Sequence, residues 1–213
     1  MEFDLAFVTK VFAALFAIMN PVANVPVFLS LTAGASDSVQ KRVALTATLG
    51  TVIGCVVSVL AGKFILTLFG IGVNDFRLAG GLLILLIAVT MLQGSDSHVH
   101  ATTPMEKAED IDPTGVAIYP LTIPLLVGPG TIATLIVFGE TARTQGKIVE
   151  LLLGLSSFLA LLALTLLSAP FLGRYLPPEA TAITRRLMGM ILAALAVEMI
   201  ITSLRTAFPG LGS

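Results

Sequence analysis

Residues 18–23, which read IMNPVA, decide the fold because they place asparagine and proline in the middle of an apolar segment. The surrounding residues 11–36 contain no Asp, Glu, Lys or Arg. A helix needs only about 20 apolar residues to cross the hydrocarbon core of a bilayer. Proline inside a helix removes one hydrogen bond and clashes with the carbonyl four residues earlier. The stretch therefore predicts a membrane-spanning helix that is broken near its centre.

Five further apolar stretches follow, and together the six predict an all-α polytopic membrane protein. They are residues 43–62, 78–95, 113–139, 151–173 and 187–204, and only the last contains a charged residue, Glu198. The stretches are uniformly apolar and lack the alternation of membrane barrel strands, so helices are expected. We expect six transmembrane helices at residues 4–31, 43–69, 76–93, 114–139, 147–173 and 184–206.

The composition excludes several classes of function. Charged residues make up 12% of the 213 residues, against about 25% in a soluble domain. The net charge of −1 does not suggest a nucleic-acid partner. The single cysteine, Cys55, allows neither an internal disulfide nor a thiolate metal site. Because the motifs of hydrolases, nucleotide-binding proteins and metalloproteases are absent from the sequence, we expect neither enzymatic activity nor a cofactor.

The only substantial hydrophilic stretch, residues 94–113, divides the chain into two halves of three predicted helices each. The expected organisation is a first repeat at residues 1–94, a polar linker at 95–113 and a second repeat at 114–213. The linker holds His98 and His100, which could bind a metal ion. Two histidines alone are a weak signal, so a solvated linker without metal is the expected interpretation.

An internal repeat supports this division. Asn20-Pro21 and Gly128-Pro129 are 108 residues apart, and the strings RLAG at 77–80 and RLMG at 186–189 are 109 apart. Three helices are an odd number, so the second repeat must enter the membrane from the opposite face. The sequence therefore predicts two inverted three-helix repeats with broken first helices, an arrangement common in secondary transporters.

Each break has the residues that begin a new helix. Asn20 and Gly128 suit the N-cap position, and Pro21 and Pro129 suit the first helical position. A helix that begins near the bilayer centre points free N–H groups and a positive dipole end towards it, beside carbonyls freed in the preceding turn. Such donors and acceptors suit a small zwitterion. The alternative is a pair of proline kinks whose backbone groups are satisfied by neighbouring helices.

We therefore predict a substrate-binding site at the two breaks. Its expected residues are Asn20, Pro21, Val22, Ala23, Asn24, Pro26, Thr122, Pro124, Gly128, Pro129, Gly130 and Thr131. The threonines can instead bond harmlessly to their own helices. Glu198 is a candidate for carrying a coupling proton, because an acid inside a membrane helix is costly and commonly functional. Alternatively, it pairs with Arg77 or Arg205, or faces the headgroups.

Two strings carry a resemblance to a known family: NPVANVPVFL at residues 20–29 and PLTIPLLVGPGTIAT at residues 120–134. They resemble the MarC family of bacterial and archaeal inner-membrane proteins, and the likeness extends over almost the whole chain. The family motif has glycine or alanine near position 23, so Asn24 is a departure. The resemblance implies six spans, a multi-pass place in the inner membrane, and transport of small neutral amino acids such as glycine or alanine.

The orientation and two rival functions stay open at this point. Basic residues are almost evenly divided between the two sides, so the positive-inside rule does not decide. We expect both termini outside, because Lys41 and Arg42, like Arg185 and Arg186, lie close to span ends. An exporter of larger amphipathic compounds would be expected to have more aromatic residues near the breaks. A membrane scaffold that transports nothing would not require two matched helix breaks.

Overall fold

A computed structural model describes residues 3–93, 113–172 and 177–208. Helices make up 89% of the structure, and no strand occurs in these ranges. The all-α prediction is confirmed. The elements are α1 (Leu5–Met19), α2 (Pro21–Leu31), α3 (Asp37–Leu68), α4 (Val73–Gln93), α5 (Pro113–Val116), η1 (Ala117–Leu126), α6 (Pro129–Gln145), α7 (Ile148–Leu167), α8 (Ala169–Leu172) and α9 (Pro178–Ala207).

Five helical segments are long and apolar enough to cross a bilayer. They are Leu5–Leu31, Asp37–Leu68, Val73–Gln93, Ile148–Leu167 and Ala182–Ala207. The expected span at 114–139 is instead divided among α5, η1 and α6, and its apolar helix Thr114–Ile123 is shorter. Several helices also begin earlier than the apolar runs predicted, because polar residues continue the helix beyond the apolar run.

The second break is longer than the sequence suggested. Inside η1, Tyr119 and Ile123 have extended backbone angles (φ −129° and −121°). Each residue precedes a proline, and proline pushes the residue before it out of the α region. The chain therefore bends at Tyr119, at Ile123 and again at Gly128, where the prediction placed one interruption only.

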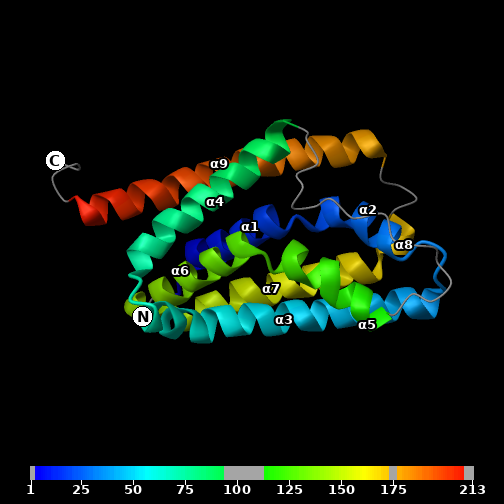
Figure 1. The fold of residues 1–213 in the computed structure, drawn as a ribbon, viewed down its shortest axis with the longest axis horizontal. Helices are drawn as coiled ribbons and strands as arrows, with labels where there is room; N and C mark the ends of the chain where they lie inside the picture. Colours follow the sequence, from blue (N-terminus) through cyan, green and yellow to red (C-terminus); the bar gives the residue numbers. More distant parts are fainter. Residues whose placement is uncertain (1–2, 94–112, 173–176, 209–213) are drawn as a thin grey trace.

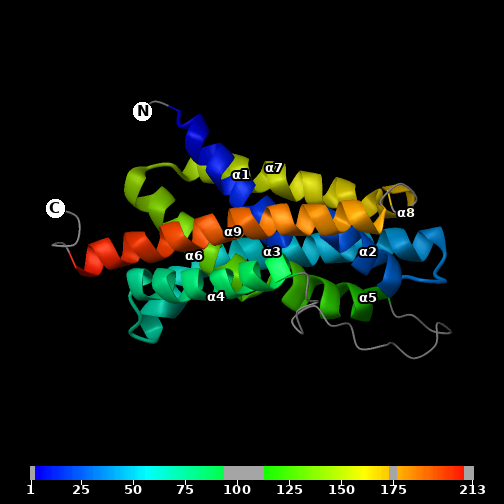
Figure 2. The ribbon, with the colours of Figure 1, turned by 90° about the horizontal axis from the view of Figure 1, so that it is seen from above.

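The helices form a layered bundle with the broken helices inside. Figure 1 shows α4 and α9 along one side and α3 and α7 along the other, with α1 and α6 between them. Figure 2, seen from above, shows α9 above α4, with the start of α1 and the end of α9 at the same end of the bundle. In Figure 1, α1 and α2 run from left to right, whereas α5, η1 and α6 run from right to left. The first helices of the two halves thus have opposite directions.

Small residues bring α4 and α9 close together. A Cβ placed on Gly81 would lie 3.1 Å from the carbonyl oxygen of Ala196, and one on Gly189 would lie 3.2 Å from that of Ala88. These glycines therefore allow the two helices to approach closely. On the outside, α3 exposes a row of large apolar side chains, with Leu60 at 65% and Phe64 at 71%. Such a surface suits lipid rather than water.

Candidate functional site

The first break is a single residue. Asn20 has φ 40° and ψ 72°, the left-handed conformation that asparagine tolerates better than most residues. Its N–H donates to the carbonyl of Phe16 at 2.9 Å, which ends α1. Its side-chain oxygen accepts from the N–H of Ala23 at 3.3 Å, which begins α2. The predicted N-cap role of Asn20 is confirmed, and the same residue also caps the preceding helix.

Asn24 closes the first break from the far side. Its side-chain nitrogen donates to the carbonyl of Met19 at 2.5 Å, and the residue is buried. Met19 is the last residue of α1, so this bond satisfies a carbonyl that the break would otherwise leave unpaired. Pro21 is buried and Pro26 is exposed on the outside of the bundle. An exposed side chain does not line the break, so Pro26 is not placed as a residue of the predicted site would be.

The second break is closed in a similar way. The hydroxyl of Thr131 donates to the carbonyl of Leu126 at 3.0 Å, again across five residues from the end of the preceding helix. The N–H of Val127 donates to the carbonyl of Thr122 at 2.8 Å. Gly128 is the N-cap of α6 and Pro129 its first residue, as predicted, although Pro129 is exposed.

The hydroxyl of Thr122 bonds to backbone carbonyl groups. Its hydroxyl lies 2.7 Å from the carbonyl oxygen of Ala117 and 3.3 Å from that of Ala47 on α3. The side chain is buried against Gly50. Thr122 therefore joins η1 to α3. Pro124 lies in η1, but its side chain is outside the described part of the structure.

The two new helices differ at their N-termini. Asn20 caps α2, whereas no side chain caps α6. The N–H groups in the first turn of α6 consequently lack the partner that Asn20 gives to α2. This end of α6 carries a partial positive charge.

The two breaks are neighbours. A Cβ placed on Gly130 would lie 3.9 Å from Cγ2 of Ile18, which is two residues before Asn20. It would also lie 3.4 Å from side-chain atoms of Ile84 and Ile87 on α4. The region after the second break therefore meets the region before the first, and the immediate surroundings of Gly130 are apolar.

A cavity of about 300 Å³ lies between α1, α4, α6 and α9 next to the breaks. Ile18 and Ile84, which approach Gly130, also line this cavity. Its α1 residues extend from Phe7 to Ile18, so it follows about 16 Å of helix. Thr134 lines it with a buried hydroxyl that has no hydrogen-bond partner. We call this space the central cavity.

Glu198 lines the central cavity but does not pair as expected. Its carboxylate lies 2.5 Å from the ammonium of Lys10 on α1, and the two side chains are 53% and 45% exposed. Of the alternatives to the coupling role, a pairing with Arg77 or Arg205 is therefore wrong, since the partner is Lys10. The sequence could not show that α1 and α9 are neighbours at this depth.

Two other acids within the helices were overlooked. Glu150 on α7 is buried, and its carboxylate accepts from the N–H of Asp4 at 3.4 Å. Glu140 on α6 has a side chain only 16% exposed and lies 2.5 Å from the ammonium of Lys63. Both stand just outside apolar runs, where the sequence suggested span ends. Both carboxylates are less exposed than that of Glu198.

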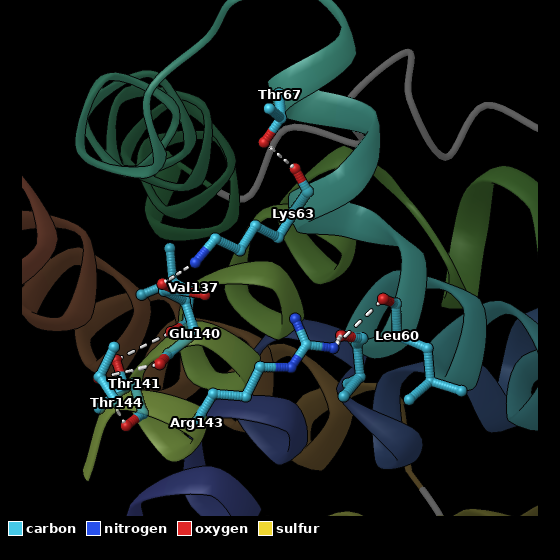
Figure 3. A network of polar contacts seen from close by, with 9 residues as sticks. Leu60, Lys63, Thr67, Val137, Glu140, Thr141, Arg143 and Thr144 are labelled. Carbon is cyan, nitrogen blue, oxygen red and sulfur yellow. Dashed lines mark hydrogen bonds and ion pairs between the residues drawn. The ribbon is translucent and has the colours of Figure 1, made fainter.

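Polar contacts hold the end of α6 to α3, as Figure 3 shows. Beside the Lys63–Glu140 ion pair, the guanidinium of Arg143 donates to the carbonyls of Val59 at 2.7 Å and Leu60 at 3.2 Å. Gly139 allows the approach, because a Cβ there would lie 3.2 Å from the carbonyl oxygen of Val59.

Asp4 anchors the start of α1. It accepts from the N–H of Phe7 at 2.9 Å and lies 2.8 Å from the ammonium of Lys147. The hydrogen bond from Lys147, followed by that from Phe7, lowers the pKa of Asp4. Within the described residues, no group of three or more His, Cys, Asp or Glu side chains could hold a metal ion. His98 and His100 lie outside the described ranges.

Residues 5–208 match the model of the MarC family integral membrane protein, which is most of the chain. The chain belongs to the MarC family. The UPF0056 membrane protein YhcE of Escherichia coli (strain K12) is 36% identical, covering 98% of this chain and 97% of the relative. The UPF0056 membrane protein YvbG of Bacillus subtilis is 34% identical, covering 98% and 99%.

An archaeal UPF0056 membrane protein, from Methanocaldococcus jannaschii, is 34% identical over 96% of this MarC-family chain and 98% of its own length. No solved structure matches the chain. The resemblance seen in residues 20–29 and 120–134 is thus confirmed at the level of the family. The MarC-family chain is an integral, multi-pass membrane protein.

The sequence did not show that polar residues of this MarC-family chain converge on the central cavity. Lys10, Arg77 and Thr134 come from three helices, and their convergence depends on tertiary structure. One local signal was present on α6. Thr134, Thr141 and Gln145 follow helical spacing and make a polar stripe along one face of α6.

Proposed function

We propose that this MarC-family chain is a secondary transporter of small neutral amino acids such as glycine or alanine. The observation that carries the proposal is the meeting of two interrupted helices beside a partly polar cavity. Interrupted helices near the middle of a membrane commonly form the substrate site of secondary transporters. In this proposal the chain is a carrier and neither an enzyme nor a scaffold.

The proposal includes six crossings in two inverted repeats, at residues 1–94 and 114–213. It treats η1 and α6 as one interrupted crossing. In its support, the first helix of each half packs on the second helix of the other half: α1 on α7, and η1 with α6 on α3. The third helices, α4 and α9, pack on each other. This reciprocity is what a two-fold axis in the membrane plane would produce.

The chemistry at the breaks suits a zwitterion. The uncapped N–H groups at the start of α6 and the side-chain nitrogen of Asn20, buried without a partner, can donate to a carboxylate. The carbonyls of Met19 and Leu126 each accept one bond from a side chain. A carbonyl oxygen has two lone pairs, so each can accept a second bond from an ammonium group.

The rival function, export of larger amphipathic compounds, fits less well. The central cavity is about 300 Å³, which is at the small end of the range for ligand pockets. Only Phe7 and Phe138 are aromatic among its lining residues. We place the chain in the inner membrane with both termini outside, following the basic pairs Lys41-Arg42 and Arg185-Arg186.

Reconstitution tests the proposal directly. Purified protein in liposomes should take up labelled glycine or alanine and should exchange it in counterflow, with and without a pH gradient. Liposomes without protein and an excess of unlabelled amino acid are the controls. Absence of both uptake and counterflow for all small neutral amino acids would overturn the proposed function.

A further inference from the structure

A second cavity, of about 550 Å³, lies where α4 begins and where α6 and α9 end. These helix ends are at the left of Figure 1. The second cavity shares Arg77 and Thr141 with the central cavity, so the two spaces adjoin. We call it the vestibule. Its position near helix ends places it close to one membrane surface, between water and the central cavity.

Three buried polar atoms line the vestibule without a hydrogen-bond partner. They are Nε of Arg77, Oε2 of Glu140 and Oγ of Ser203, one from each of α4, α6 and α9. Ser203 is only 3% exposed. Buried polar atoms in folded proteins are nearly always hydrogen-bonded. Three unpaired atoms around one space therefore call for a polar partner, which water or a polar ligand can supply.

The unpaired atoms combine opposite charges. Arg77 forms no ion pair with a described residue, and its only side-chain bond is a long one, 3.4 Å, to Asn74. Glu140 gives one carboxylate oxygen to Lys63 and leaves the other free, as the close-up in Figure 3 illustrates. Because no ion pair joins Arg77 to Glu140, the cation and the anion remain available to separate groups of a ligand. Asp75 adds a second carboxylate to the lining.

We propose that the vestibule binds the charged end of a free α-amino acid. Arg77 and Ser203 would hold the carboxylate, through a charge-assisted bond and a hydroxyl bond, and Glu140 would hold the ammonium group. The vestibule is then an entry site from which the amino acid passes to the central cavity. This inference rests on the proposed transport function and adds residues that lie outside the helix breaks.

A binding titration tests the vestibule. The protein is placed in nanodiscs of phosphatidylglycerol, which lacks an ammonium group, and titrated with alanine, propionate and ethylamine. Alanine carries both charged groups, whereas the other two carry one each. Variants Arg77→Gln and Ser203→Ala remove the proposed carboxylate partners, and Glu140→Gln removes the ammonium partner. Matched controls are Arg205→Gln on α9 and Ser157→Ala on α7, which line neither cavity.

We expect Arg77→Gln and Glu140→Gln to weaken alanine binding and to raise the KM of uptake by about tenfold. Ser203→Ala should have a smaller effect in the same direction, and the controls none. Propionate and ethylamine should bind far more weakly than alanine. Ser203→Ala removes a single oxygen and should fold normally. It can therefore test the site even if a charge variant does not fold.

Two different failures can be told apart. If the wild type binds and transports alanine but the three vestibule variants do so with unchanged Kd and KM, the vestibule is not a binding site and the proposed function stands. If the wild type neither binds nor transports small neutral amino acids, the proposed function fails as well. If phosphatidylethanolamine stabilises the wild type through Arg77 and Glu140 while alanine does not bind, the vestibule holds a lipid headgroup, which overturns the inference.

Discussion

At the scale of single residues, the polar side chains at the breaks first serve the backbone. Asn20 caps two helices, and Asn24 and Thr131 each bond to the last carbonyl of the preceding helix. Capping by Asn20 could be predicted, because it depends on the next few residues only. The bond from Asn24 could not, because it requires the left-handed turn at Asn20 to bring Met19 within reach.

Replacement of Asn24 should therefore destabilise the protein. Asn24→Ala leaves the carbonyl of Met19 without its side-chain donor at a buried position, which costs about 1–3 kcal/mol. Thermal unfolding in detergent should show a lower midpoint than the wild type. Ser30→Ala, at an exposed position of α2, is the control and should leave the midpoint unchanged. An unchanged midpoint for Asn24→Ala would show that the bond contributes nothing.

At the scale of the elements, glycines decide which helices can touch. The sequence carries a signal of close approach at Gly80, Gly81 and Gly189, because small residues let membrane helices come together. It did not assign partners to the glycines of α3, because η1 and α6 lie many residues away. The structure places Gly54 against Val127 and Gly62 against Ile136.

Gly62→Ala should separate α3 from α6. A Cβ there would lie only 2.2 Å from Cγ1 of Ile136, so one helix must move. Overpacking of this kind costs about 1–3 kcal/mol, visible as a lower thermal midpoint. Ile136→Ala removes the clashing atoms, so the double variant should be more stable than the sum of the two single effects predicts. If the stability effects of the two single variants were strictly additive, residues 62 and 136 would not clash with each other.

Glu198 belongs to the same scale, since its ion pair with Lys10 joins α9 to α1 beside the central cavity. Glu198→Gln mimics a protonated carboxyl group that cannot release its proton. If Glu198 carries the coupling proton, this variant should lose pH-gradient-driven uptake and keep counterflow exchange. Glu179→Gln, at the exposed start of α9, is the control. Undiminished gradient-driven uptake by Glu198→Gln would show that Glu198 carries no coupling proton and that its ion pair only holds α9 to α1.

At the scale of the whole molecule, apolar runs and a repeated Pro motif were enough to predict an all-helical membrane protein. They also predicted that the two breaks would come together, and Ile18 before the first break is a neighbour of Gly130 after the second. Two features could not be predicted from the sequence. The bends at Tyr119 and Ile123 extend the second break, and the polar cavity linings assemble from α1, α4, α6 and α9 only in the folded bundle.

The opposed direction of the two halves gives a topological prediction. Ser38 lies in the first turn of α3 and Gln145 is the last residue of α6. In Figure 1 the start of α3 and the end of α6 lie at opposite ends of the bundle. Single cysteines at these exposed positions, in a Cys55→Ser background, should react with an impermeant thiol reagent from opposite faces of the membrane. Labelling of both from one face would exclude the inverted repeat.

The unequal construction of the two breaks has an energetic consequence for such a carrier. Two identical inverted halves would make the inward-facing and outward-facing states mirror each other, with equal free energy in a symmetric membrane. Here one interruption is a single capped residue, whereas the other extends over several bends and ends in an uncapped helix. In the proposed carrier the two states would therefore differ in free energy, and we expect the empty protein to prefer one of them.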